Sequence, residues 1–230
     1  MHKVYRKDEI IRLSTNKNVL HLGFIQHSHL WKTKIEQNDW LHSDLIKVAN
    51  QVVGIDYLCE EVTEIKEELC CNVYCADVMY LDRLKLNEKY DVIVCGELIE
   101  HIENPGLMLD GIKRFMHEKS ILIITTPNPW RKLWVHNMYS VILEEKWLNK
   151  EHVSWYSYQT LKQMLERKGY TEVNYQYYSS ESSQYIEKKN IIIKAFIKIK
   201  DALLDRYYEK KGSVQNYQGL FFVAMIEGGG

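Results

Sequence analysis

Residues 90–105 read YDVIVCGELIEHIENP, and this stretch joins a buried strand to a turn rich in acidic groups. The continuous apolar run 92–95 is typical of a strand that is covered on both faces in a parallel sheet. A glycine ends the run, and Asn104-Pro105 marks the start of a helix. Three carboxylates and one imidazole lie between the strand and the helix. Open α/β sheets bind ligands at the carboxyl ends of their strands, so we expect a functional site at this turn.

Other apolar runs alternate with helical patterns along the chain. The alternation predicts an α/β fold with a doubly wound, mostly parallel seven-stranded sheet and an antiparallel C-terminal edge. Ser157 is the expected N-cap of a helix that carries Leu161 and Leu165 and ends at Gly169. Strands are expected at residues 19–24, 52–56, 71–75, 90–95, 121–125, 171–178 and 220–226.

Length and composition limit what the protein can be. The chain has 230 residues and is 46% hydrophobic, which predicts one domain over residues 1–230. Breaks in the regular alternation of strands and helices indicate inserted segments near 129–150 and 186–212. Thirty basic and thirty-one acidic residues give a net charge of −1, so we expect no nucleic-acid partner. No apolar run is long enough to cross a bilayer, so we expect no membrane insertion.

The cysteines and two histidines raise the question of a metal site. Five cysteines fall in or beside predicted strands, and this odd number predicts reduced thiols in a cytoplasmic protein. Cys70, Cys71 and Cys75 lack paired Cys-x-x-Cys spacing, so we interpret them as strand packing residues. We interpret His27 and His29 as residues that contact a substrate or lie in a loop, and no metal is predicted.

The carboxyl ends of the first three strands carry candidate cofactor contacts. A single glycine, Gly23, follows the first strand, so a pyrophosphate cradle is unsupported and a cofactor without phosphates fits better. Asp56, with Tyr57 beside it, can accept hydrogen bonds from both hydroxyls of a ribose. Asp77 can accept from the amine of an adenine that packs on Val78. Turn or helix capping is the alternative role of each aspartate.

In order and spacing, these segments resemble the class I S-adenosylmethionine-dependent methyltransferases over nearly the whole chain. The resemblance implies a Rossmann-like methyltransferase fold, S-adenosylmethionine as the cofactor, and Glu97 on the sulfonium side of that cofactor. The first motif departs from the family pattern, because His21 replaces an acid and Ile25 and His27 replace glycines. The interval from Gly23 to Asp56 is longer than the family's usual one, which implies an inserted segment near 29–41. The matching segments are Val19 to Gly23, Val53 to Asp56, Ala76-Asp77, Tyr90 to Pro105, Thr125 to Asn128 and His152 to Ser157.

Methyl transfer from a sulfonium requires alignment of donor and acceptor and the exclusion of water. A hydroxyl acceptor is helped by a general base, for which His152 is the first candidate and His101 the second. Capping or packing is the alternative role of His101. The expected function is O- or N-methylation of a small polar acceptor, most readily an oxygen of a nucleotide-linked or surface-glycan precursor. The alternative is a methyltransferase-like binding protein that has lost catalysis through its degenerate glycine motif.

Two inserted segments carry further aromatic and basic residues. Trp130, Trp134 and Tyr139 either line an acceptor pocket or pack beneath a lid. The pattern over residues 191–208 predicts an amphipathic helix. We interpret it as a helix that packs on the domain or in a homodimer, and contact with anionic lipid is the alternative.

Overall fold

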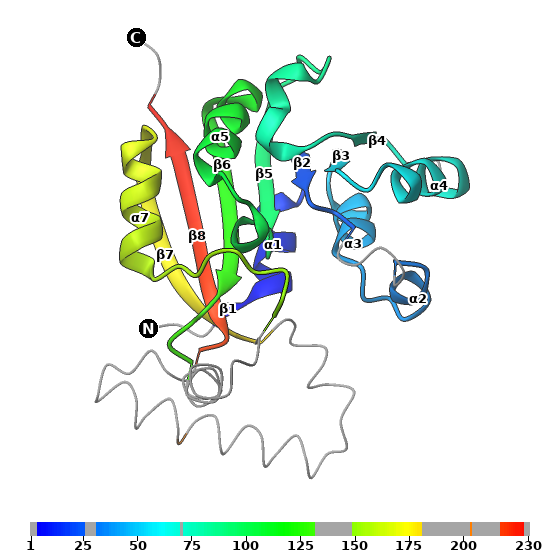
Figure 1. Ribbon diagram of the computed structural model, residues 1–230. Helices are drawn as coiled ribbons and strands as arrows, with labels where there is room; N and C mark the ends of the chain where they lie inside the picture. Colours follow the sequence, from blue (N-terminus) through cyan, green and yellow to red (C-terminus); the bar gives the residue numbers. More distant parts are fainter. Residues whose placement is uncertain are drawn as a thin grey trace.

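The apolar runs form the strands of one sheet at the centre of the molecule (Figure 1). The computed structural model describes residues 4–25, 31–69, 71–131, 149–180, 203 and 217–227. Within them the sheet has eight strands in the order β1-β7-β8-β6-β5-β2-β3-β4, and only β8 is antiparallel to its neighbours. The strands are β1 (Val4–Tyr5), β2 (Asn18–Leu22), β3 (Gln51–Asp56), β4 (Val73–Cys75), β5 (Tyr90–Gly96), β6 (Met116–Pro127), β7 (Tyr170–Ser180) and β8 (Gly219–Ile226).

Helices cover both faces of this sheet (Figure 1). The helices α1 (Arg6–Ser14) and α3 (Leu41–Val48) pack on one face. The helices α5 (Pro105–Ile112) and α7 (Tyr158–Arg167) pack on the other. The remaining helices of the described residues are α2 (Trp31–Glu36), α4 (Cys59–Leu69) and the short η1 (Val78–Arg83), η2 (Ile99–His101) and η3 (Lys113–Phe115).

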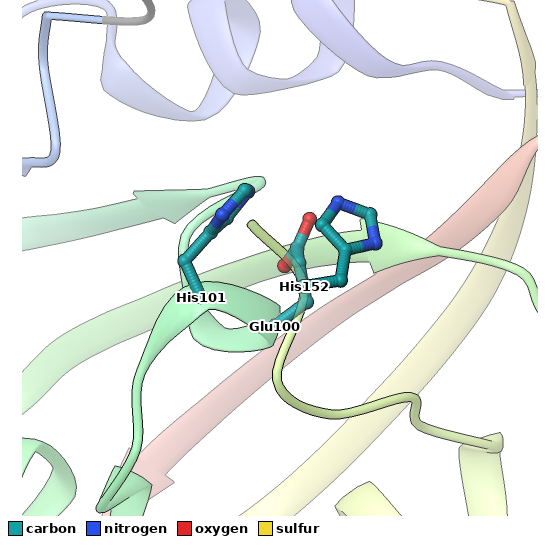
Figure 2. A group of neighbouring side chains, drawn as sticks. All are labelled: Glu100, His101 and His152. Atoms are coloured by element: carbon teal, nitrogen blue, oxygen red, sulfur yellow. The ribbon is translucent and has the colours of Figure 1, made fainter. Parts of the chain in front are cut away.

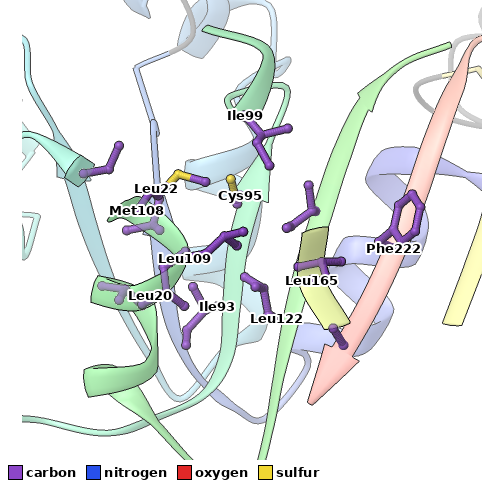
Figure 3. Packing of buried hydrophobic residues seen from close by; sticks show 14 of the residues in the cluster. Leu20, Leu22, Ile93, Cys95, Ile99, Met108, Leu109, Leu122, Leu165 and Phe222 are labelled. Carbon is purple, nitrogen blue, oxygen red and sulfur yellow. The ribbon is translucent and has the colours of Figure 1, made fainter. Parts of the chain in front are cut away.

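The core follows the two-residue period of strand side chains. In β5, Ile93 and Cys95 belong to the cluster under α5 and α7, whereas Val92 and Val94 belong to the cluster under α1 and α3. Figure 3 shows the first cluster, in which side chains of β2, β5 and β6 pack with Leu109 of α5. Because both faces are covered, the apolar runs of the sequence are continuous and do not alternate with polar residues.

The predicted α/β class is confirmed, with two differences in the sheet. β1 adds an eighth strand beside β7, and its two residues are too few to leave a pattern in the sequence. β8 is antiparallel, as predicted for the C-terminal strand, but it lies between β6 and β7 and not at the edge. The apolar pattern of a strand sets which faces it buries, whereas its neighbours are set by the path of the whole chain.

Two predicted helix starts are confirmed by their capping bonds. The Asn104 side chain accepts from the Leu107 N–H at 3.3 Å, at the start of α5. The Ser157 hydroxyl accepts from the Thr160 N–H at 3.2 Å, within a capping box at the start of α7. Gly169, with φ of +76°, follows the end of α7 as predicted.

The described part of the inserted segment 29–41 packs as a small core of its own. Trp31 and Trp40 are buried in a cluster with Phe24 and with Val62 of α4. The Trp40 indole N–H donates to the Phe24 carbonyl at 2.9 Å, so the insert is fixed to the residues that follow β2. A predicted role of this insert in covering the cofactor or the acceptor stays a prediction.

The cysteines differ from the sequence expectation of reduced thiols. Cys59 and Cys75 form a disulfide with Cα atoms 5.0 Å apart, so the prediction is wrong for this pair. The two residues meet because β3 pairs with β4, which places Asp56 opposite Cys75. Cys59 follows shortly after Asp56, at the first position of α4. Cys71 and Cys95 are not in disulfide bonds among the described residues. The cytoplasmic location stays a prediction, without the support of a fully reduced set of thiols.

Several sequence predictions fall on residues outside the described ranges. These are the segments 132–148, 181–202 and 204–216, with Trp134 and Tyr139, and most of the proposed dimer helix 191–208. His27 and His29 also lie outside them. Among the residues that the structure describes, no helix combines the length and apolar character needed to span a membrane.

Candidate functional site

The turn after β2 brings the backbone close to the next strand end. Gly23 has φ of +65°, and its N–H donates to the Ile55 carbonyl at 2.8 Å. A Cβ at this position would lie 2.9 Å from Leu98 Cδ1, and its left-handed φ is rarely adopted by other residues. The single glycine of the first motif therefore stands where the turn requires a glycine.

Asp56 ends β3 and holds this turn in place. Its carboxylate accepts from the Ile25 N–H at 2.9 Å and from the Leu58 N–H at 3.3 Å. The residue is 3% exposed, and burial raises the pKa of the carboxyl group, while backbone N–H donors, Ile25 first, oppose the rise. An ionised carboxylate has about four acceptor positions, so two such bonds leave capacity for a ligand hydroxyl.

Asp77 lies beside Asp56 on the next strand end. The Ala76 N–H donates to the Asp56 carbonyl at 2.9 Å, which fixes the two strand ends together. Asp77 Oδ1 accepts from the Met79 N–H at 2.8 Å and caps η1, the alternative role considered from sequence. Val78 is buried in the main core, whereas Tyr57 is 69% exposed. The residues predicted to bind the nucleoside thus lie at the carboxyl ends of neighbouring strands, and Tyr57 is open to solvent.

Glu97 follows β5 in a constrained conformation. Its φ is +53°, and its N–H donates to the Thr125 carbonyl at 2.9 Å. Its carboxylate accepts from the Tyr178 hydroxyl at 3.0 Å and lies 3.8 Å from the Arg6 guanidinium. Arg6 also donates to the Thr125 hydroxyl at 3.0 Å, so the first residue of α1 helps to build the end of the sheet. Sequence reasoning missed Arg6, because it precedes every predicted strand.

Glu100, His101 and His152 form a cluster at the same end of β5. Their ligand atoms all lie within 4.8 Å of one another, and Figure 2 shows the carboxylate between the two imidazole rings. The rings meet edge to face with centroids 4.7 Å apart. The N–H groups of Val153 and Ser154 donate to the Glu100 carbonyl at 2.9 and 3.2 Å, which holds the second segment against the first.

Glu100 is the member of this cluster that sequence reasoning did not select. Its side chain is 1% exposed, and its Oε2 accepts from the Thr126 hydroxyl at 3.0 Å. Burial raises the pKa of Glu100, and the charge of Glu97 adds to the rise. Burial lowers the pKa of His152, and the nearby His101 adds to the fall. The sequence feature that could have indicated Glu100 is its position next to His101 in the acidic turn.

A surface hollow of about 370 Å³ lies at the opposite end of β3. Trp40, Gln51, Leu69 and Cys71 are among its lining residues, and none of the predicted site residues lines it. Ligands of doubly wound sheets bind at the carboxyl ends of the strands, where Asp56 lies. The hollow is therefore separate from the candidate site.

Fold and site together define the class of this protein. The doubly wound sheet is the fold of S-adenosylmethionine-dependent methyltransferases, and the predicted glycine turn and strand-end acids lie at the carboxyl ends of its strands. The chain belongs to the methyltransferase domain family, whose model matches residues 29–175. S-adenosylmethionine is the cofactor of this class.

Solved structures share the fold over nearly the whole chain. A S-adenosylmethionine-dependent methyltransferase from Archaeoglobus fulgidus has a TM-score of 0.57 at 17% identity, over 95% of this chain and 92% of that one. A TehB-like S-adenosylmethionine-dependent methyltransferase from Corynebacterium glutamicum has a TM-score of 0.56 at 13% identity, over 98% and 90%. At these identities, the likeness shows a common fold.

A curated relative matches over a shorter stretch. The ubiquinone biosynthesis O-methyltransferase of Rickettsia canadensis (strain McKiel) is 34% identical over 55 residues. This stretch is 24% of this chain and 23% of the relative, so the match spans about a quarter of that protein.

Proposed function

We propose that this chain transfers a methyl group from S-adenosylmethionine to an oxygen of a small polar acceptor. The observation that carries the proposal is the cluster of Glu100, His101 and His152, which stands at the strand ends that also hold Gly23 and Asp56. When bound, the cofactor supplies a methyl group on a positively charged sulfur. O-methylation is also the reaction in the name of the curated relative.

The residues at the ends of β3 and β4 fit the nucleoside of this cofactor. Asp56 retains acceptor capacity for ribose hydroxyls, and Asp77 retains capacity for an adenine amine beside its capping bond. Tyr57 offers an exposed aromatic ring next to Asp56. Gly23 lets the backbone approach the ligand closely. Glu97 supplies negative charge near the sulfonium, moderated by Arg6.

A hydroxyl acceptor would be activated at the imidazole pair. In O-methylation the acceptor oxygen bonds to the methyl carbon, the carbon–sulfur bond breaks with its electron pair on sulfur, and the hydroxyl proton leaves to a base. His152 is the first candidate for that base and His101 the second, because both rings lie beside the buried carboxylate of Glu100. Trp130, which is exposed, would contribute to an acceptor wall.

The chemical class of acceptor that we propose is a small polar molecule such as a nucleotide-linked or surface-glycan precursor. The net charge of −1 disfavours a nucleic acid as the acceptor. A binding protein without catalysis is the alternative, and it is motivated by Ile25 and His27 in place of glycines.

Calorimetry with S-adenosylhomocysteine tests the cofactor site. Wild-type protein should bind it, and Asp56→Asn should weaken binding by about tenfold or more, because a charged acceptor of hydrogen bonds is lost. Asp77→Asn keeps the cap of η1, since asparagine caps equally well. A change in the affinity for S-adenosylhomocysteine in this variant therefore reports the charge of Asp77. Asp110→Asn is the matched control, because Asp110 pairs with Lys168 on the surface, away from the strand ends.

Radiolabelled methyl transfer to a panel of hydroxylated acceptors tests the reaction. Transfer to an oxygen acceptor supports the proposed function. Tight binding of S-adenosylhomocysteine with no transfer to any member of a broad panel favours the binding-protein alternative, and no binding by the wild type overturns both.

A further inference from the structure

We propose that Glu100, His101 and His152 bind a divalent transition-metal ion. The three residues offer one carboxylate oxygen and two imidazole nitrogens, all within 4.8 Å of one another (Figure 2). They come from η2 and from the segment before α7, which are fifty residues apart in the chain. The site goes beyond methyl transfer, for which the fold and its cofactor need no metal.

The carboxylate of Glu100 is oriented toward the centre of the cluster. Its Oε2 accepts from the Thr126 hydroxyl at 3.0 Å, while its Oε1 is buried with no hydrogen-bond partner among the described residues. A buried polar atom without a partner is unfavourable by about 1–3 kcal/mol, and more if it carries charge. A bound cation would satisfy this oxygen.

The two histidines are arranged as metal ligands commonly are. His101 Nδ1 lies 3.2 Å from the Glu151 carbonyl, an acceptor, so Nδ1 carries the proton and Nε2 keeps its lone pair. Such a bond from the second ring nitrogen to a carbonyl fixes the tautomer and the orientation of a ligating histidine. His152 is held by the backbone bonds of Val153 and Ser154 to Glu100.

The donor set selects the kind of ion. Imidazole with one carboxylate suits zinc, cobalt, manganese and iron, whereas calcium and magnesium prefer oxygen alone. Tetrahedral coordination with bonds of about 2.1 Å places ligand atoms about 3.4 Å apart, so the largest separation in the cluster must close by about 1.4 Å. Rotation of the three side chains would have to supply this approach. Three protein ligands leave a coordination position open.

The open position gives the ion a role in the reaction, and this step rests on the proposed function. A hydroxyl oxygen of the acceptor would occupy it, and the ion would lower the pKa of that hydroxyl. The proton would leave to water, and the oxygen would bond to the methyl carbon while the carbon–sulfur bond breaks with its electron pair on sulfur. With the ion bound, the two imidazoles would be its ligands, and water would take the place of His152 as the proton acceptor considered above.

Metal binding is tested on the full chain after treatment with a chelator. Cobalt(II) is titrated into the protein and followed by visible absorption, and zinc(II) is titrated in a calorimeter. We expect one equivalent of cobalt to bind with the absorption of a nitrogen- and oxygen-ligated ion, and zinc to displace it. Glu100→Gln and His152→Ala should each weaken binding by at least about tenfold.

Two further variants keep the test decisive. His117→Ala is the matched control, because His117 pairs with Asp91 at the amino end of β6 and should leave the affinity unchanged. His101→Gln alters a residue that is only partly buried, so it tests the site even if the buried variants fail to fold. Absence of stoichiometric binding in the wild type, or equal affinity in His101→Gln, overturns the proposal.

The catalytic role of the ion is separated from the proposed function by two measurements. Methyl transfer that falls at least about tenfold on chelation and returns with cobalt or zinc supports the role. Full transfer by the chelated protein overturns the metal role and leaves the proposed function intact. Failure to bind S-adenosylhomocysteine overturns the proposed function, whereas the metal titration still decides whether the ion binds.

Discussion

The buried histidine pair between β2 and α3 predicts a specific sensitivity to acid. His21 and His42 are almost fully buried, and their Nδ1 atoms lie 3.2 Å apart. Burial lowers the pKa of His42 from 6.5 to about 3. Burial also lowers the pKa of His21 well below 6.5, and the charges of His42 and Arg6 add to that fall. Both rings are therefore neutral in the folded protein near neutral pH.

The sign of the effect follows from the protons bound in each state. Below pH 6.5 the unfolded chain takes up protons that the folded protein excludes, so folding stability falls as the pH decreases toward the folded pKa. From pH 6.5 to about pH 5, at about 1.4 kcal/mol per pH unit, His42 accounts for a loss of about 2 kcal/mol. The pKa of His21 is lowered in the same direction, so His21 adds to this loss.

The double variant His21→Leu/His42→Leu removes this contribution. Replacing both partners by apolar groups of similar size avoids leaving one polar ring unsatisfied. Urea unfolding of the wild type and the variant is measured at about pH 7.5 and about pH 5. Glu100, whose raised pKa gives a titration of opposite sign, is present in both proteins, so its effect cancels in the comparison.

We expect the unfolding free energy of the wild type to fall by at least about 2 kcal/mol more than that of the double variant between these two pH values, because His42 alone accounts for about that much. The single variant His42→Leu should be less stable than the double variant at about pH 7.5, because His21 then loses its hydrogen-bond partner. An equal change with pH in the wild type and the double variant would refute the reasoning.

Three further predictions concern the turn, the cap and the disulfide. Gly23→Ala should lower the unfolding free energy by about 1–2 kcal/mol, because of the φ of +65° and the contact with Leu98; unchanged urea unfolding would contradict this. Ser157→Ala should cost about 1 kcal/mol through loss of the α7 cap, and Ser157→Thr, which retains a hydroxyl, should restore most of it. Reduction of the Cys59–Cys75 disulfide, which spans 16 residues, should lower stability by about 3 kcal/mol. The stability of the variant Cys59→Ser/Cys75→Ser should not change on addition of reductant. A wild type whose stability is equally unchanged would contradict the presence of the disulfide.

The residues at single strand ends were predictable from sequence. Gly23, Asp56 and Asp77 each follow an apolar run, and the end of a parallel strand fixes where the next side chains go. These residues lie where the sequence placed them, although Asp56 and Asp77 also make the backbone bonds that were considered as alternative roles.

The joining of distant segments was not predictable in the same way. His101 and His152 were selected separately as base candidates, but no periodicity shows that their rings lie edge to face around Glu100. Arg6 reaches Glu97 from a helix that precedes the first central strand. Contacts of this kind depend on how strands and helices are ordered in space.

The sequence by itself determined the alternation of strands and helices, the α/β class and the strand ends at which the candidate site lies. It did so because apolar periodicity and capping residues act over a few neighbouring positions. The tertiary structure alone decided the place of β8 inside the sheet, the bond between Cys59 and Cys75, and the cluster around Glu100. The physical reason is that these contacts form only after strands far apart in sequence have paired, and the same local patterns are compatible with more than one such pairing.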